Sequence, residues 1–585
     1  MHACRLLTKN WRVGAAAAVL VLVSTVGYRL QASPPSSAAP GHTFQHVLLI
    51  SIDGMHETDF LNCASGHYCP HLAELAESGV DYRDTSTSRP SDSFPGLTAI
   101  VSGSSPRSSG AFYDVAYDRS LDPPALTTGN GVAGAPGLCT PGTPPMGYTT
   151  EFDEGIDLDQ TKLNGGAPTG VDGGISSIDR RKLDRDPANN CAPVYPWNFV
   201  RTNTIFGVIH AAGWYTAWSD KHPSYSSVSG PGNGTNVDDY YSPEINSIPV
   251  PQPGIPGCDP LPDQTAAAKS NSWTDSFQNI QCYDQLKVNA VLNEINGKRH
   301  NGMGTAPRPA ILGMNFQVVS VGEKLIEKSL DLRGGYVDSV GTVTAPLRSE
   351  IEFADASIGK MVAALKANGI WESTLIVITA KHGQSPLDSA RYLGIATVTD
   401  DPVTTSPATI LDAAGCIPTS ESPSNSTGIG PTEDDVSLIW LNDRCSTEDA
   451  VSMLRSGSPA TKNVAGIGQI LSGQPLATYF NRPGLPPGWD PRTPDIIVVP
   501  DVGVTYSGSG KKLAEHGGFS RDDTNVMLLL SNPSIHPLTV TSPVETAQVA
   551  PTILAALGLD PNQLQAVQLE HTQVLPAVQF TEVGP

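Results

Sequence analysis

The chain has 585 residues, far more than one minimal core requires, and its length alone is compatible with several domains. Charged residues make up only 16%, while 56 glycines and 50 prolines indicate many long ordered loops. The net charge of −22 disfavours binding to nucleic-acid polymers or anionic membranes through bulk electrostatics.

The N-terminal segment has the pattern of an export signal. Three basic residues precede an apolar run over residues 13–28, and small residues follow at Ala32-Ser33. This run is shorter than the roughly 20 residues that a membrane span prefers. We therefore expect a signal peptide over residues 1–32, a Ser/Pro/Ala linker over residues 33–44, and a secreted or periplasmic protein without a stable membrane span. An uncleaved membrane anchor is the alternative.

The segment after the linker begins with a strand. Residues 46–55 read His-Val-Leu-Leu-Ile-Ser-Ile-Asp-Gly-Met, so a run of β-favouring residues delivers Asp53 to a tight glycine turn. A short amphipathic helix is expected over residues 70–79, and a helix of small residues follows Ser93 up to Gly103. Strands and helices then alternate along the chain, which favours a mainly parallel sheet.

The middle of the chain continues this alternation between two long loops, residues 117–200 and 223–280. Further elements are predicted, in order, at residues 203–212 (helix), 214–218 (strand), 285–296 (helix), 309–318 (strand), 346–368 (helix) and 373–380 (strand). The last strand is as apolar as a buried parallel strand should be. The strand at 214–218 ends in Ser219-Asp220-Lys221-His222-Pro223, a polar cluster that could reach the rim of a site.

The last third of the chain predicts an inserted subdomain and a return to the core. Residues 390–490 hold a predicted strand and helix and resemble a cap, whereas residues 494–506 and 545–558 are expected to rejoin the core as a strand and a closing helix. The predicted fold is therefore α/β, with a mainly parallel central sheet flanked by helices. Residues 45–389 and 491–585 would form the catalytic core.

Eight of the nine cysteines lie beyond the export signal, as near neighbours in sequence. An even set in an exported chain indicates disulfides, although eight cysteines allow 105 connectivities. A metal site is the alternative, but no Cys-x-x-Cys spacing supports it. We expect the four sequential pairs Cys63–Cys69, Cys139–Cys191, Cys258–Cys282 and Cys416–Cys445.

Four polar residues stand where predicted strands end or a helix begins. Asp53 ends the first strand, Ser93 precedes Phe-Pro at a helix start, and His382 and His516 are each followed by glycine. Ligands of open α/β sheets bind at the carboxyl ends of the strands, and a helix N-terminus suits a phosphate. The alternatives are an ordinary Asp-Gly turn, a helix-capping serine and structural histidines.

This order of motifs resembles the alkaline phosphatase superfamily, and most nearly its type I phosphodiesterase/nucleotide pyrophosphatase family. The resemblance implies an alkaline phosphatase-like fold with Ser93 as the nucleophile. It also implies a divalent cation, zinc, held by Asp53, His382 and His516. The family commonly has asparagine where this chain has Gly96, so contacts to the phosphoryl oxygens are expected from Arg89 or from backbone N–H groups.

The chain departs from the family at its other metal ligands. Relatives with two zinc ions carry Asp-His-Gly where this chain has Lys381-His382-Gly383, and an Asp-x-x-x-His pair after a middle strand. When that strand is aligned with residues 311–317 of this chain, Ser320 and Lys324 fall where relatives have the aspartate and the histidine of this pair. A one-residue shift of the alignment places Val319 and Glu323 there instead. The site would then hold a single ion or none.

Two lysines offer an alternative to the missing metal. Losing two carboxylates and gaining two ammonium groups changes the charge of the site by as much as two zinc ions would. We therefore hypothesise that Lys324 and Lys381 lie near the positions of the lost metals, stabilise the phosphoryl oxygens and activate Ser93.

The predicted function is an exported hydrolase of small phosphate esters, with phosphodiester or nucleotide-like substrates favoured by the nearest family. A non-catalytic exported binding protein built on a degraded site is the alternative. A sulfatase is disfavoured because residues 91–95 lack the Cys/Ser-x-Pro/Ala-x-Arg signature of that branch.

Overall fold

The computed structural model describes residues 44–578 except for residues 127, 130–131, 134–137, 153–154, 169–172, 248–254, 256–257, 259–271, 396–403, 425–428, 457–462, 465 and 508–509. The predicted signal peptide and nearly all of the linker lie outside the described residues. The described residues belong to one compact unit.

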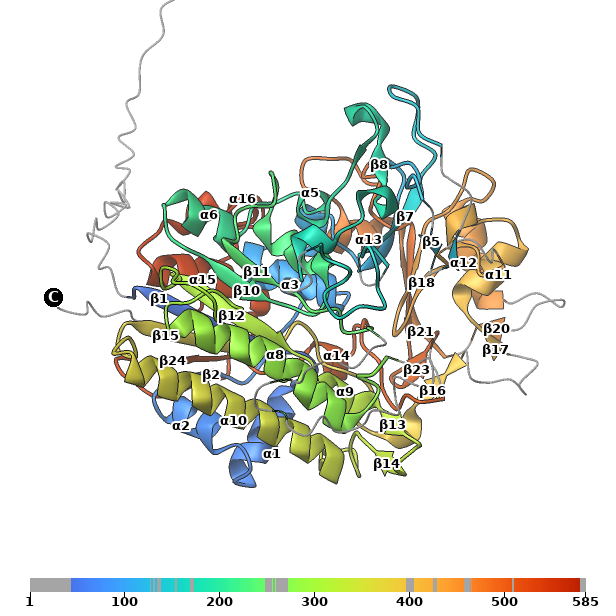
Figure 1. The fold of residues 1–585 in the computed structure, drawn as a ribbon. Coiled ribbons are helices and arrows are strands. Elements are labelled where there is room, and N and C mark those ends of the chain that lie inside the picture. The colour runs from blue at the N-terminus through green and yellow to red at the C-terminus, as the bar shows by residue number, and fades with distance from the viewer. Residues whose placement is uncertain are drawn as a thin grey trace, which may run out of the picture. The chain divides into compact units, whose positions relative to one another are not determined.

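An eight-stranded sheet forms the centre of this unit (Figure 1). The strands from β11 to β15 in this order run parallel, whereas β24 is antiparallel to both of its neighbours. The mainly parallel sheet that the sequence predicts is therefore confirmed. In spatial order the strands are β11 (Asp239–Tyr241), β10 (Ala217–Ser219), β12 (Ile311–Phe316), β1 (His46–Ile52), β15 (Thr374–Thr379), β24 (Leu529–Ser531), β2 (Gly79–Tyr82) and β25 (Leu538–Val540).

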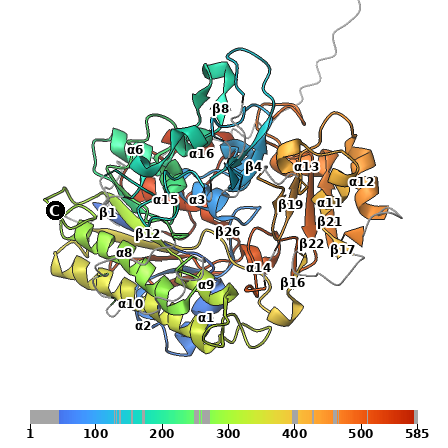
Figure 2. The same cartoon turned by 45° about the vertical axis from the view of Figure 1, so that its right-hand side comes forward.

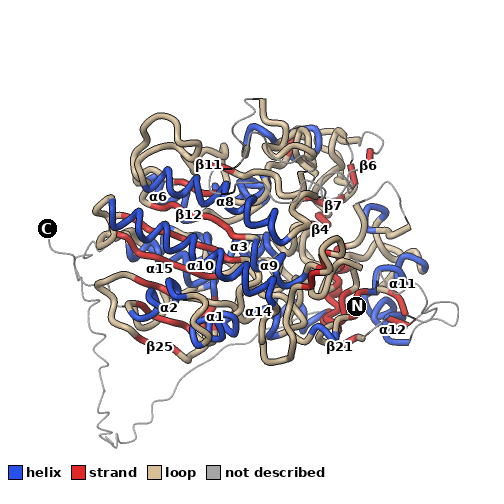
Figure 3. The backbone as a smooth tube through the Cα atoms, turned by 60° about the horizontal axis from the view of Figure 1, so that its bottom comes forward, coloured by secondary structure: helices blue, strands red, loops and turns tan. Residues whose placement is uncertain are grey.

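Strand β1 is buried on both faces because helices cover both sides of the sheet. Its alternate residues belong to two separate cores: Val47 and Leu49 to one, Leu48 and Ile50 to the other. Figures 1 and 3 show α8 and α10 side by side across one face of the sheet. That face is covered by α1 (Glu57–Ser65), α2 (Pro70–Glu77), α8 (Phe277–Ile295) and α10 (Ala345–Ala367), and the other by α3 (Ser93–Ser102), α6 (Ile205–Ala211) and α15 (Val549–Ala556).

A second, four-stranded sheet carries the predicted cap (Figure 2). Its order is β18 (Thr432–Glu433), β19 (Ser437–Ile439), β22 (Ile496–Pro500) and β21 (Ile467–Ser472), with α11 (Pro407–Ala413), α12 (Thr447–Ser456) and α13 (Gly473–Phe480) nearby. The expectation that residues 494–506 rejoin the core sheet is wrong. Strand β22 pairs antiparallel with β19 and β21 instead, so the inserted segment extends beyond residue 490.

All four predicted disulfides are present in the structure. The widest, Cys139–Cys191, closes 52 residues of the first long loop, where β4 (Val115–Asp118) pairs with β7 (Tyr148–Glu151). Across the described part of the chain, no helix has both the length and the apolar character needed to cross a membrane.

Candidate active site

Three neighbouring parallel strands deliver one residue each to the same edge of the sheet. The register of β1 places Ile52 opposite Phe316 of β12, and β15 pairs with the other side of β1. Continuing both registers, Asp53, Gln317 and Lys381 occupy equivalent positions, one residue beyond β1 and β12 and two residues beyond β15. This edge is where an open α/β sheet binds its ligands.

Ser93 reaches the same edge from the first turn of α3. The carboxylate of Asp92 caps this helix by accepting from the Phe94 N–H at 2.9 Å. The Lys221 ammonium donates to Ser93 Oγ at 2.9 Å, and His382 Nε2 lies 3.1 Å from the same oxygen. A cation and an imidazole therefore both contact this hydroxyl, as an activated nucleophile requires.

The tautomer of His382 follows from its second nitrogen. His382 Nδ1 lies 3.0 Å from the Gly383 carbonyl oxygen, which can only accept. The proton of a neutral ring therefore resides on Nδ1, and Nε2 is left to accept the hydrogen bond of the Ser93 hydroxyl. His382 is fully buried.

Hydrogen-bond donors surround the Asp53 carboxylate. Asn315 Nδ2 donates to Oδ1 at 2.7 Å and Gln317 Nε2 to Oδ2 at 2.6 Å. The ammonium groups of Lys221 and Lys381 lie 3.7 and 4.0 Å from Oδ2. Burial alone would raise the pKa of Asp53, but the nearby cations outweigh burial and hold that pKa well below its usual range.

Lys381 is entirely buried and has two partners. Its ammonium lies 2.8 Å from Asp220 Oδ1 and 4.0 Å from the centre of the Tyr225 ring, a cation–π distance. Burial lowers the pKa of Lys381, and Asp220 and Asp53 oppose this shift. The ion pair connects the end of β10 to the end of β15, so it fixes the spacing of the strand ends.

His516 stacks on His382, with the ring centres 4.0 Å apart. Its Nδ1 lies 3.6 Å from Asp92 Oδ1. Burial, followed by repulsion from His382, Lys324 and Lys221, lowers the pKa of His516 well below its usual value. The ring is therefore uncharged at neutral pH.

A cavity of about 470 Å³ opens in front of these side chains, a size typical of small-molecule sites. Tyr113, Lys221, Gln317, Lys324 and His516 are among the residues that line it. Ser93, Asp53, Lys381 and His382 are buried and do not line this cavity, so the cavity meets the site at Lys221, Gln317 and His516.

The structure brings together most, but not all, of the residues that the sequence singles out. Asp53, Ser93, Lys381, His382 and His516 converge. Lys324 lines the same cavity, but its ammonium is directed towards Glu515, at 3.8 Å.

Three expected positions differ in the structure. Arg89 is exposed and lines two other hollows with Phe519 and Glu545, so it does not reach Ser93. The Ser320 hydroxyl donates to Gln384 Oε1 at 2.5 Å rather than facing Asp53. A Cβ atom at Gly96 would lie 2.2 Å from the Lys381 carbonyl oxygen, so this structure has no room for the family's asparagine at position 96.

Gln317 and Asn315 are site residues that sequence reasoning missed. The sequence alignment considered Ser320 and Lys324, or Val319 and Glu323, in this segment and did not consider the strand end. Gln317 is the first residue after β12, just as Asp53 is the first after β1. Counting from the strand ends would have identified it.

The residues around Asp53 do not fit the zinc ion that the resemblance implies. A metal ligand must offer a lone pair, whereas Asn315, Gln317 and Lys221 present N–H donors to this carboxylate. The fully buried ammonium of Lys381 would also repel a dication.

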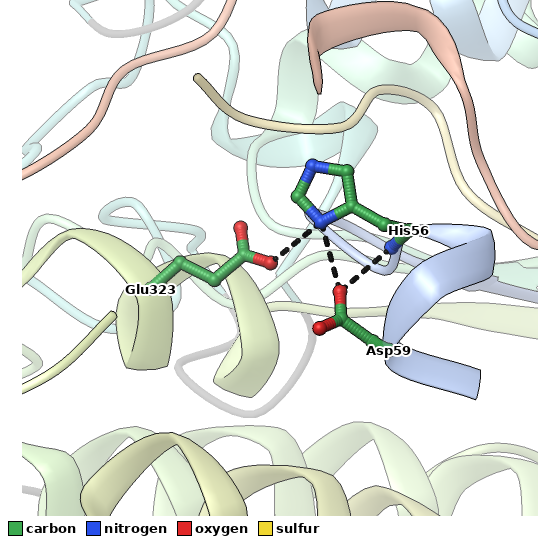
Figure 4. Close-up of side chains that lie close together, drawn as sticks. All are labelled: His56, Asp59 and Glu323. Atoms are coloured by element: carbon green, nitrogen blue, oxygen red, sulfur yellow. Dashed lines mark hydrogen bonds and ion pairs between the residues drawn. The ribbon is translucent and has the colours of Figure 1, made fainter. Parts of the chain in front are cut away.

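One group of metal-ligand type does occur among the described residues, behind the site. His56, Asp59 and Glu323 each place a ligand atom within 4.8 Å of the others (Figure 4). His56 Nδ1 contacts Asp59 Oδ2 at 2.8 Å and Glu323 Oε1 at 3.2 Å, while its Nε2 lies 2.7 Å from the Asp522 carbonyl oxygen.

The surroundings of His56 indicate an imidazolium rather than a metal ligand. Burial would lower the pKa of His56, but Glu323 and Asp59 outweigh it and raise that pKa well above its usual value. The carboxylates of Asp59 and Glu323 both face Nδ1, whereas Nε2 lies near the Asp522 carbonyl oxygen and also accepts from the Gln384 backbone N–H at 3.0 Å. The positive ring occupies the place that an ion would take between the two carboxylates.

A family model described as type I phosphodiesterase/nucleotide pyrophosphatase matches residues 47–155 and 211–520, more than half of the chain. No curated protein matches the chain.

Solved structures are similar to this chain at low sequence identity. The wild-type alkaline phosphatase PafA is 12% identical with a TM-score of 0.51, and the alignment covers 88% of this chain and 96% of that one. Murine ectonucleotide pyrophosphatase/phosphodiesterase 5, also solved as an inactive variant with AMP, is 13% identical with a TM-score of 0.48 and the same coverage. Phosphonoacetate hydrolase from Sinorhizobium meliloti 1021 is 14% identical with a TM-score of 0.46, again with coverage of 88% and 96%.

Proposed function

Because the chain belongs to the type I phosphodiesterase/nucleotide pyrophosphatase family, it is a phosphoric ester hydrolase, and we propose that it is an exported enzyme acting through Ser93. The observation that carries this proposal is the pair of contacts at Ser93 Oγ. Lys221 donates to this oxygen and His382 Nε2 is positioned to take its proton.

The proposed reaction has two steps. Ser93 Oγ attacks phosphorus and its proton passes to His382 Nε2, while the bond from phosphorus to the leaving oxygen breaks. Water then hydrolyses the phosphoserine and restores the free hydroxyl. Such a reaction depends mainly on positioning and on stabilising charge at the phosphoryl oxygens, which the N-terminus of α3 and Lys221 would supply.

The remaining lysines have supporting roles in this proposal. Lys324 lines the cavity and would attract the anionic part of the substrate. Lys381 would act on Ser93 through the positive potential that it adds beside Asp53. Arg89 is left out because it lines other hollows.

The substrate class and the location are part of the proposal. Phosphodiester or nucleotide-like substrates are favoured by the family description, and the cavity is large enough for a small-molecule ester. Export to the periplasm or the medium is supported by the N-terminal sequence pattern and by four disulfides, which persist in oxidising compartments.

The test is a panel of aryl phosphate monoesters, aryl phosphate diesters and aryl sulfate esters. Ser93→Ala should lower kcat on the preferred ester by about 10³-fold or more, as expected for loss of a nucleophile. Ser456→Ala, at an exposed position of α12, is the control and should keep full activity. Rapid acid quenching should also leave a phosphoryl group on the peptide that contains Ser93.

Two outcomes would reject the proposal. Turnover that Ser93→Ala leaves unchanged would exclude this nucleophile. Phosphate binding without turnover of any ester would favour the alternative of a non-catalytic binding protein.

A further inference from the structure

We propose that the ammonium groups of Lys221 and Lys381 replace the metal ions of this family, so that the site binds and activates a phosphoryl group without a divalent cation. The inference rests on the proposed function for its catalytic part only. Its binding part concerns the affinity of the site for phosphate and for metal, and can be measured without turnover.

Lys221 is the group in contact with the nucleophile. Its ammonium lies 2.9 Å from Ser93 Oγ and 3.7 Å from Asp53 Oδ2, so it bridges the hydroxyl and the carboxylate. A bound metal would supply positive charge to the nucleophile, and the Lys221 ammonium supplies positive charge to the same oxygen. The side chain is 12% exposed and lines the cavity, so its charge also faces an entering phosphate.

Lys381 is the second cation and is more deeply buried than Lys221. It is fully buried between Asp220 and Asp53, at 2.8 and 4.0 Å. Two lysines and two aspartates therefore form a cluster whose formal charges cancel. A divalent cation added to this cluster would leave two uncompensated charges in a site with little solvent, which is strongly unfavourable.

The side-chain amides of Asn315 and Gln317 also occupy the carboxylate that a metal would need. Asn315 donates to Oδ1 of Asp53 and Gln317 to Oδ2, so each oxygen of this carboxylate already accepts a hydrogen bond from an amide. His382 Nε2 contacts Ser93 Oγ at 3.1 Å and is therefore also occupied. Asp53 and His382, two of the three expected metal ligands, therefore already have hydrogen-bond partners within the site.

Lys324 is not part of this replacement, in contrast to the hypothesis from the sequence. Its ammonium lies 3.8 Å from Glu515 Oε1, and neither lysine-to-Asp53 contact involves it. Lys221, from the polar cluster after β10, takes the role that the sequence alignment gave to Lys324.

The first experiment measures metal and phosphate binding of the intact protein. The protein is purified from zinc-supplemented medium without chelator, and its metal content is determined by mass spectrometry. We expect substoichiometric zinc, an unfolding temperature that EDTA leaves unchanged, and calorimetric binding of orthophosphate that persists in EDTA. Stoichiometric metal whose removal abolishes phosphate binding would overturn the inference.

The second experiment compares two variants of Lys221. Lys221→Gln removes the charge and should weaken orthophosphate binding about tenfold or more and lower kcat about 10²- to 10³-fold. Lys221→Arg keeps the charge and should retain most of the binding. Lys366→Gln on the surface of α10 is the control, since it removes a lysine far from the cluster and should change neither quantity. Unchanged phosphate binding in Lys221→Gln would refute the role of this lysine.

The two proposals can fail separately. A wild-type protein that binds phosphate in EDTA through Lys221 but hydrolyses no ester would reject the catalytic function and keep the inference. A wild-type protein that hydrolyses esters only when zinc is bound would keep the function and reject the inference. If the Lys221 variants do not fold, the metal content and the EDTA-resistant phosphate binding of the wild type still decide.

Discussion

The Lys381 ammonium lies 2.8 Å from Asp220 Oδ1, and neither side chain is exposed to solvent. Asp220 also accepts hydrogen bonds from the Trp218 indole N–H and from the Lys221 backbone N–H, both at 2.9 Å. The pair therefore belongs to a bonded network, and removing one member would leave the other as a buried charge without its counterion.

The first prediction concerns this pair. Lys381→Met should lower the free energy of unfolding by about 3–5 kcal/mol, because Asp220 would remain buried and uncompensated. The double variant Lys381→Met/Asp220→Asn should recover part of this loss, since no charge is then left unpaired. Urea denaturation measures both values, with Lys366→Met as a surface control. A single variant as stable as the wild type would show that the pair contributes nothing.

The second prediction concerns the close approach of α3 to the end of β15. A Cβ atom at Gly96 would lie 2.2 Å from the Lys381 carbonyl oxygen, so Gly96→Ala must displace the helix that carries Ser93. We expect a loss of stability of about 1–3 kcal/mol together with a lower kcat. Gly510→Ala, where the added carbon meets only the end of the Lys328 side chain, is the matched control. Equal behaviour of the two variants in denaturation and kinetics would contradict the prediction.

Much of the architecture could be predicted from the sequence, for a physical reason that β1 illustrates. A strand buried on both faces must be apolar throughout, so residues 45–54 identify both a strand and its central place in the sheet. Strand β22 has the same apolar character but lies in the cap sheet. Apolarity signals burial and does not say in which sheet the strand is buried.

The candidate site was only partly predictable, because its side chains meet through strand register. Asp53 and Ser93 stand beside recognisable turns. Gln317 has no such signal, since an isolated glutamine after a strand is common. Lys221 stood in a polar cluster noted from the sequence, but its contact with Ser93 depends on the pairing of β10 with β12, which local patterns do not reveal.

The third prediction is a pH dependence of stability that originates in Glu421. Burial raises the pKa of this carboxyl to about 8, against an opposing hydrogen bond from the Thr149 hydroxyl at 2.5 Å. Between about pH 4.5 and 8 the folded protein keeps this proton and the unfolded chain loses it, so stability falls as the pH rises through this window. Over this window, we expect Glu421 to lower the free energy of unfolding by about 1–3 kcal/mol.

Glu421→Gln should remove that contribution, because glutamine does not titrate. Urea denaturation at pH 5 and pH 8 should show a smaller difference in stability for the variant than for the wild type. Glu448→Gln, on the exposed face of α12, should behave as the wild type does. An identical pH difference in wild type and Glu421→Gln would exclude this carboxyl as the source.

The fourth prediction concerns the disulfide of the first long loop. Cys139 and Cys191 are 52 residues apart, so their bond removes considerable freedom from the unfolded chain. Replacing both with alanine should lower the free energy of unfolding by about 2–4 kcal/mol. None of the described residues between these cysteines contributes a strand to the main sheet, so turnover at 25 °C should be largely retained. A variant that keeps its stability but loses turnover would show that this disulfide supports the active site and not the stability of the fold.

The equivalence of Asp53, Gln317 and Lys381 beyond three adjacent strands has a wider consequence. Their backbone positions depend on the pairing of β1 with β12 and β15, and not on which side chains they carry. The sheet thus holds three backbone positions at a fixed spacing, and the side chain at each position can be exchanged. Point substitutions at these positions can replace metal-coordinating carboxylates with ammonium and amide groups. The order of the strands and the packing of both cores would not change.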